Sequence, residues 1–313
     1  MDNQFRTRIE IPLCSFQMTP GQSVLAVGSC FAEHIGLHLE ATKFSILVNP
    51  SGIMFNPVSV AETLNNGLSG KLPPESLLVK HEELYFSLLH HGRFTSTDKS
   101  TLLDLLADHN RRLQTKMQSA DIAILTLGTA YVYRHLPTDC IVANCHKLPG
   151  KEFDRKLLTV NEVVEVLRTT LDAWISVRPD LQIIMSVSPV RHWRDGAVAN
   201  QRSKATLLLA VQALQEIYPD LYYFPAYELL LDELRDYRFY STDMLHPAPL
   251  AVEYIWQRFQ QATMDESTLS FVRKMEELQQ ALRHQAIHPQ SAAHQKFLQQ
   301  LEKKVRQLQH QYP

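Results

Sequence analysis

The sequence has almost no surplus of charge of either sign. Its 313 residues include 31 Lys and Arg against 33 Asp and Glu, so the formal net charge is −2 with neutral histidines. Proteins that bind a phosphate backbone or an anionic lipid surface rely on a basic surplus. We therefore predict neither a nucleic-acid partner nor a membrane partner.

Long apolar runs and a recognisable leader are also missing. No stretch approaches the roughly 20 apolar residues that span a bilayer. The residues from Met1 to Arg8 lack the basic-then-apolar layout of a secretory signal. The four cysteines, at positions 14, 30, 140 and 145, are irregularly spaced, which suits a reducing compartment better than a disulfide framework. The expectation is a cytoplasmic protein.

Several motifs of cofactor and nucleotide enzymes are missing as well. The chain has no phosphate-binding loop ending in Lys-Ser or Lys-Thr, no dinucleotide glycine triplet, no His-Glu-x-x-His and no Gly-x-Ser-x-Gly. Cys140, Cys145 and His146 lie close in sequence, but their spacing matches no zinc pattern. We predict no cofactor and no metal.

What the chain does contain is an alternation of apolar strands and amphipathic helices. Strands are predicted at 23–28, 44–48, 122–127, 183–188 and 221–224, and helices at 30–42, 57–67, 100–118, 160–177 and 200–217. Near-continuous apolar strands separated by helices are typical of a parallel sheet covered on both faces. The predicted fold class is α/β, a three-layer α/β/α sandwich with a mostly parallel sheet of about five strands.

Other segments depart from this alternation. Residues 77–94 and 131–147 each favour an antiparallel strand–turn–strand insertion, the second with Leu136 to Asp139 as its turn. From Asp265 the composition shifts to Gln, Lys, Glu and Leu at helical spacing, interrupted at His288-Pro289. We predict a domain over residues 1–264 and a helical hairpin over 265–313. The hairpin either docks on the domain or mediates self-association, which makes a homo-oligomer a candidate state.

Three residues form the predicted catalytic group. Ser29 follows the first strand at Gly28 and precedes a helix, whose N-terminal N–H groups favour a developing oxyanion. Asp243 and His246 lie three residues apart in a loop before a helix over 248–261, so the carboxylate can orient the imidazole as a base for the serine.

The same residues allow other interpretations. Asp243 could serve only to cap its helix. His192 is a rival base to His246. Cys30 is a rival nucleophile to Ser29, since a thiol at a helix N-terminus has a lowered pKa. We favour the hydroxyl because residue 30 is expected to turn inward with the helix.

Further candidates for the oxyanion or substrate site lie on loops that follow the predicted strands. They are Gly52, Asn56, Gly128, Thr129, Asn144, His146, Arg191 and His192. The glycines permit close approach of a ligand, and the other side chains offer hydrogen-bond donors or a positive charge. Asn56 could instead cap the helix at 57–67, and the segments around Asn144 and Arg191 could serve only for packing.

Gly28-Ser29-Cys30-Phe31-Ala32 is the signature of the GSCFA family, which the chain resembles over about residues 5–260. Further blocks that look like the family are Asn49-Pro50-Ser51-Gly52, Leu127-Gly128-Thr129-Ala130, Asn144-Cys145-His146-Lys147, Ser188-Pro189-Val190-Arg191-His192 and Asp236-Tyr237-Arg238-Phe239-Tyr240. The family in turn resembles the SGNH/GDSL hydrolases, which use a serine, a glycine, an asparagine and a late Asp-x-x-His pair. The resemblance assigns these roles to Ser29, Gly52, Asp243 and His246. The asparagine is missing, because Gly-x-Asn is replaced by Gly128-Thr129-Ala130, and one lost oxyanion donor can cost about 3 kcal/mol.

The resulting hypothesis is a serine esterase that acts on a small acyl ester, such as an O-acetyl group on a carbohydrate. The N–H groups of Ser29 and Gly52 would hold the oxyanion. The expected partner is a small-molecule or glycan ester. An acyltransferase with the same triad, and a noncatalytic ligand-binding or assembly protein on the same scaffold, are the alternatives.

Overall fold

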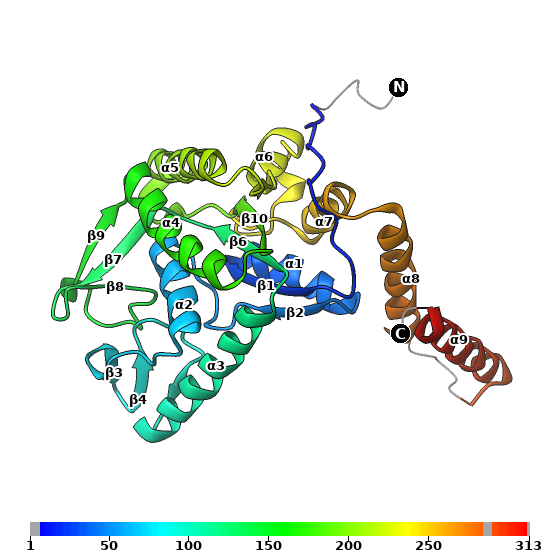
Figure 1. Cartoon of the computed structure of the whole chain (residues 1–313), viewed down its shortest axis with the longest axis horizontal. Helices are drawn as coiled ribbons and strands as arrows, with labels where there is room; N and C mark the ends of the chain where they lie inside the picture. Colours follow the sequence, from blue (N-terminus) through cyan, green and yellow to red (C-terminus); the bar gives the residue numbers. More distant parts are fainter. Residues whose placement is uncertain (1–6, 284–289, 312–313) are drawn as a thin grey trace.

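The computed structural model describes residues 7–283 and 290–311, and its centre is a parallel sheet (Figure 1). The strand order is β11-β10-β6-β1-β2, and every neighbouring pair is parallel. The strands are β1 (Ser23–Gly28), β2 (Ser45–Val48), β6 (Ile122–Leu127), β10 (Gln182–Val187) and β11 (Tyr222–Tyr223). Because all run the same way, their carboxyl ends lie along one edge of the sheet.

Helices cover both faces of this sheet. Alternate side chains of β1 explain why: Val24 and Ala26 join one buried apolar cluster, and Leu25 and Val27 join another. The first cluster includes α1 (Cys30–Ala41) and α7 (Pro249–Thr263). The second includes α2 (Pro57–Ser69), α3 (Lys99–Ser119), α4 (Val160–Val177) and α5 (Gly196–Ile217). The predicted three-layer α/β/α sandwich is confirmed.

Two small antiparallel sheets extend from the sandwich. One contains β3 (Leu78–His81), β4 (Leu84–Ser87) and β5 (Thr95–Ser96), and the other contains β7 (Tyr131–His135), β8 (Cys140–Val142) and β9 (Phe153–Leu157). The strand β9 was not predicted. Its sequence is largely charged, and Arg155 stacks over the Tyr131 ring, 3.9 Å from the ring centroid, where an apolar residue would be expected.

The C-terminal part of the described chain is helical. It consists of α8 (Glu266–Arg283) and α9 (Ala292–Gln311), and the predicted interruption at His288-Pro289 lies outside the described residues. Phe271, Val272 and Met275 of α8 belong to the same buried cluster as α1 and α7. The first of the two helices therefore docks on the sandwich.

No helix within residues 7–283 and 290–311 is both long and apolar enough to cross a bilayer. The four cysteines are free thiols.

Candidate active site

The junction between β1 and α1 is packed tightly against β6. Gly28 has φ 141°, and a Cβ at this position would lie 2.0 Å from the Thr126 carbonyl oxygen. Only glycine tolerates both the backbone conformation and the contact. The chain can therefore turn from strand into helix directly beside β6.

Ser29 is the N-cap of α1, and its side chain is only 1% exposed. The Ser29 Oγ accepts the Phe31 N–H at 3.2 Å and lies 2.9 Å from the Thr126 Oγ1. Its own N–H donates to the Thr126 carbonyl oxygen and to Oγ1, at 3.1 and 2.9 Å. The N–H that was predicted to hold an oxyanion therefore has Thr126 as its partner in this structure.

Cys30 is the first residue of α1, and it is partly exposed. Burial and then the charge of Glu33 raise the pKa of the thiol, which outweighs the lowering by the Cys30 backbone N–H, so the lowered pKa expected at a helix N-terminus is wrong. The expectation that residue 30 turns inward is wrong. The capping bond with Phe31 and the contact with Thr126 turn residue 29 inward instead.

Asp243 and His246 form a pair in the loop before α7. The His246 Nδ1 lies 2.6 Å from the Asp243 Oδ2, and the backbone N–H groups of Leu245 and His246 donate to Asp243 Oδ1 at 2.9 and 3.0 Å. These backbone bonds, together with the His246 ring, lower the pKa of Asp243 to about 2. The carboxylate is therefore ionised near neutral pH and fixes Nδ1 as the protonated ring nitrogen, which leaves Nε2 able to accept a proton.

The pair lies at the carboxyl end of the sheet, beside the loop that follows β10. The Arg191 N–H, in the loop after β10, donates to the Leu245 carbonyl oxygen at 3.3 Å. Burial lowers the pKa of His34, and the charge of His246 lowers it further. His34 is one turn along α1 from Cys30. In the described part of the chain, no hydrogen bond joins His246 to Ser29 or Cys30.

His192, the rival base, has a different environment. Burial, and then the charges of Lys204 and His246, lower its pKa to about 4, so the ring is neutral near pH 7. Its ring meets Phe55 edge-on, with centroids 5.2 Å apart. Its Nε2 is buried and has no hydrogen-bond partner among the described residues. Asp243 pairs with His246 and not with His192.

The structure gives Gly52 and Asn56 packing and capping roles. The Gly52 N–H, which was predicted to hold an oxyanion, donates to the Asn49 carbonyl oxygen at 2.8 Å. A Cβ on Gly52 would lie 2.1 Å from the His91 Cβ. Asn56 caps α2: its Oδ1 accepts the Ser59 N–H at 2.9 Å, and its Nδ2 donates to the Ser59 Oγ at 3.0 Å.

Gly128 and Thr129 directly follow β6, the strand that lies beside the β1–α1 junction. Both N–H groups donate to the Phe55 carbonyl oxygen, at 2.7 and 2.9 Å. The Thr129 hydroxyl lies 3.0 Å from the Ser203 hydroxyl. A Cβ on Gly128 would lie 3.0 Å from the His192 Nε2, so this glycine lets the imidazole approach the end of β6.

The other predicted substrate residues divide between two places. Asn144 forms a turn with the His146 N–H, and the buried His146 ring contacts the Ser87 carbonyl oxygen at 2.8 Å. These two lie in the loop after β8, and His146 contacts the end of β4. Arg191 lies beside the loop that carries Asp243 and His246, and its guanidinium is 5.8 Å from the centroid of the Tyr240 ring.

Asn49 was not among the predicted site residues. It is 1% exposed, and its Oδ1 accepts the Gly28 N–H at 2.9 Å. That bond fixes the orientation of the amide, since only oxygen can accept the N–H. The Asn49 Nδ2 is buried and has no partner among the described residues. Its position directly after a strand was the available clue.

Lys204 was also missed, because it lies within an amphipathic helix. It is buried, and its Nζ donates to the carbonyl oxygens of Gly128 and Ser188, both at 2.6 Å. Burial lowers its pKa to about 7. The side chain holds the ends of β6 and β10 together behind the site.

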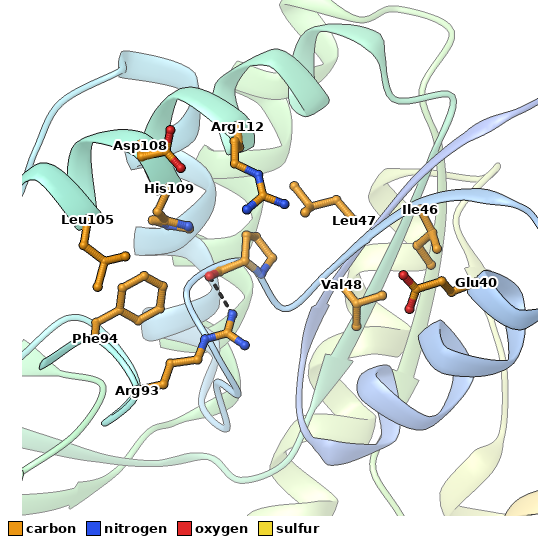
Figure 2. Close-up of a pocket in the computed structure, with 11 residues that line it drawn as sticks. Glu40, Ile46, Leu47, Val48, Arg93, Phe94, Leu105, Asp108, His109 and Arg112 are labelled. Atoms are coloured by element: carbon orange, nitrogen blue, oxygen red, sulfur yellow. Dashed lines mark hydrogen bonds between the residues drawn. The ribbon is translucent and has the colours of Figure 1, made fainter.

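A cavity of about 480 Å³ lies next to the loop that carries Asn49 (Figure 2). Arg112 extends into it from α3 and Arg93 from the opposite side. The Arg93 guanidinium donates to the carbonyl oxygens of Asn49 and Pro50, at 2.6 and 2.9 Å. In the part of the chain that the structure describes, no group of three or more His, Cys, Asp or Glu side chains could hold a metal ion.

The sequence of this chain matches the model of a known protein family. The model of the GSCFA family matches residues 23–259, which include the β1–α1 junction and the Asp243–His246 pair. The chain belongs to the GSCFA family. A second model, the C-terminal domain of GSCFA domain proteins, matches residues 275–313. No curated protein matches this GSCFA chain.

Solved structures similar to this GSCFA protein include three with TM-scores of 0.37 to 0.38. A candidate platelet activating factor from Streptococcus pneumonia is 16% identical, with 76% of this chain and 84% of that chain covered, at a TM-score of 0.38. A family 3 carbohydrate esterase from Clostridium thermocellum is 14% identical, with 81% and 98% covered, also at 0.38. A carbohydrate esterase of family 3 from Talaromyces cellulolyticus is 9% identical, with 81% and 98% covered, at 0.37.

Proposed function

We propose that this GSCFA protein hydrolyses acyl esters, with His246 as the general base and Asp243 as the group that orients it. The observation that carries the proposal is the 2.6 Å contact between His246 Nδ1 and Asp243 Oδ2 at the carboxyl ends of the strands. Ligands of open α/β sheets bind at this edge. An imidazole whose tautomer is fixed by a carboxylate is the base of acyl-transfer enzymes.

The chemistry begins with a nucleophile at the β1–α1 junction. His246 Nε2 takes its proton as the side chain attacks the ester carbonyl, and His246 then returns the proton to the leaving alcohol. Water, activated by the same nitrogen, hydrolyses the acyl enzyme. Ser29 was the predicted nucleophile. To act, its hydroxyl must leave both the Thr126 hydroxyl and the Phe31 N–H.

Asn49 supplies the amide donor that the Gly128-Thr129-Ala130 segment lacks. Its Nδ2 is unpartnered within the described residues, and its Oδ1 is bound to Gly28, next to Ser29. A buried donor that needs no reorganisation stabilises an oxyanion better than one that must first leave another partner. The N–H groups of Ser29 and Gly52 have such partners.

The proposed substrate is an ester of a small acyl group, such as an O-acetylated carbohydrate. His192 and Phe55 contact each other and lie against Gly128 at the end of β6, so they limit the room there, which favours a small acyl group. The side chains of His246 and Asp243 are 47% and 46% exposed, so a bulky alcohol can extend into solvent.

The test is hydrolysis of p-nitrophenyl acetate and of an acetylated sugar by purified variants. His246→Gln should lower kcat/KM about 100-fold or more, and Asp243→Asn should lower it in the same direction. Asn49→Asp, which keeps an acceptor for the Gly28 N–H but removes the amide donor, should lower kcat about 100-fold. His81→Gln on β3 and Asp98→Asn, the cap of α3, are the controls and should retain the wild-type rates. Wild-type protein without ester hydrolysis, or His246→Gln at the wild-type rate, would refute the proposal.

A further inference from the structure

Ser29 already has a structural role that uses its whole hydroxyl group. The oxygen accepts the Phe31 N–H, and the hydroxyl pairs with that of Thr126. The side chain is 1% exposed. Rotating the hydroxyl toward a substrate would break the cap of α1 and leave Thr126 Oγ1 without one of its partners.

Cys30, the next residue, differs from Ser29 in exposure. Ser29 is the extended N-cap, with φ −71° and ψ 176°, and Cys30 is the first helical residue, so the two side chains leave the junction in different directions. Its side chain is partly exposed. Cys30 and His34 are four residues apart and therefore share one face of α1. His38, one turn further along this face, stacks on Trp256 of α7, with ring centroids 5.0 Å apart, and α7 directly follows the loop of the Asp243–His246 pair.

A second, independent observation concerns Asn49. Its side chain is 1% exposed and is bound to the Gly28 N–H, two residues before Cys30. Its Nδ2 is a buried donor with no partner among the described residues. Buried polar groups are nearly always hydrogen-bonded, so this donor indicates an acceptor that arrives with a ligand. A carbonyl oxygen of an acyl group attached to residue 30 is such an acceptor.

We propose that the nucleophile of this site is the Cys30 thiol and not the Ser29 hydroxyl, an inference that rests on the proposed esterase function. The Cys30 Sγ attacks the ester carbonyl while its proton passes to His246 Nε2, and the oxyanion is held by Asn49 Nδ2. The C–O bond breaks, and the alcohol leaves with the proton from His246. Water then attacks the thioester, His246 takes a proton from the water, and the thiol is restored as the acid leaves.

The experiment compares Cys30→Ala, Ser29→Ala and Cys145→Ala in full-length protein. Cys145 is a second partly exposed thiol and serves as the matched control. Cys30→Ala should lose p-nitrophenyl acetate hydrolysis by at least about 100-fold. Ser29→Ala should stay within about tenfold of the wild type, and Cys145→Ala should be unchanged. Circular dichroism and the melting temperature identify any variant that fails to fold, and Cys30→Ser, which exchanges the thiol for a hydroxyl of similar size, then replaces Cys30→Ala.

Two further readouts separate this inference from the proposed function. Acid quenching during turnover should trap an acetyl group on the Cys30 peptide that neutral hydroxylamine removes, as a thioester requires. Without any ester, iodoacetamide at pH 7 should alkylate Cys30 more slowly in His246→Gln than in the wild type, with Cys145 unaffected.

The outcomes divide clearly. Loss of hydrolysis in folded Ser29→Ala together with full activity in Cys30→Ala overturns the inference and leaves the esterase function standing. Hydrolysis that depends on His246 but on neither residue also overturns it. If the wild type hydrolyses no ester, the proposed function fails, and alkylation of Cys30 that ignores His246 then overturns the inference on its own.

Discussion

The Ser29 hydroxyl lies 2.9 Å from the Thr126 hydroxyl, which joins the start of α1 to the end of β6 across 97 positions of sequence. The same threonine accepts the Ser29 N–H through two oxygens. This contact decides which neighbouring side chain at the junction faces the protein interior and which faces the candidate site.

Ser29→Ala should therefore affect stability more than chemistry. The substitution removes the side-chain cap of α1, a loss of about 1 kcal/mol in the free energy of unfolding. Urea unfolding measures it, and Asp98→Ala, which removes the cap of α3, provides a comparable loss far from the junction. A Ser29→Ala protein of wild-type stability would contradict the capping role.

Glu33→Gln should make the Cys30 thiol more reactive at fixed pH. The negative charge of Glu33 raises the pKa of Cys30, so its removal lowers that pKa and increases the thiolate fraction between pH 7 and 9. The pH dependence of alkylation by iodoacetamide, followed on the Cys30 peptide, measures the change. Glu40→Gln, at the other end of α1, is the control. A thiol that titrates identically with and without Glu33 would rule out this coupling.

Arg93→Ala should lower the rate of ester hydrolysis although Arg93 is outside the proposed machinery. Its guanidinium holds the carbonyl oxygens of Asn49 and Pro50. A loosened loop displaces the Asn49 amide, and small misplacements reduce kcat by about tenfold or more. Arg112→Ala removes the same charge from the same cavity and should leave kcat within about twofold, since among the described residues no hydrogen bond joins Arg112 to this loop. Equal effects of the two substitutions would point to charge and not to loop position.

Lys204 should make folding stability depend on pH. Its folded pKa of about 7 lies below its unfolded value, so between pH 7 and 10 the unfolded chain binds the extra proton. The free energy of unfolding of the wild type, minus that of Lys204→Met, should therefore rise by about 2 kcal/mol from pH 7 to pH 9. Urea unfolding at the two pH values measures this, with the exposed Lys151→Met as the control. A constant difference between wild type and Lys204→Met would refute the shift.

The features that the sequence predicted well are local. Val24 to Gly28 is an unbroken apolar run, and Ile122 to Leu127 is apolar except for Thr126, so the burial of both strands on their two faces followed from composition alone. The contact between Asp243 and His246 spans three residues and needs no tertiary information. In contrast, β9 carries charges on most of its positions and is held by pairing with β7.

The features that could not be predicted depend on contacts between distant segments. Whether residue 29 or residue 30 turns inward is decided by Thr126, which belongs to another strand. Asn49 became a candidate only when the structure showed its Oδ1 bound to Gly28 and its Nδ2 without a partner. Likewise, the burial of Lys204 depends on two strand ends that meet in the fold.

Because α8 shares a buried apolar cluster with α1, the C-terminal segment supports the helix that carries Cys30 from behind. Truncation after Thr263 would leave the inner side of that helix without Phe271, Val272 and Met275, in contact with water. Detachment of α8 would therefore expose the buried face of α1, the helix whose first residue is Cys30.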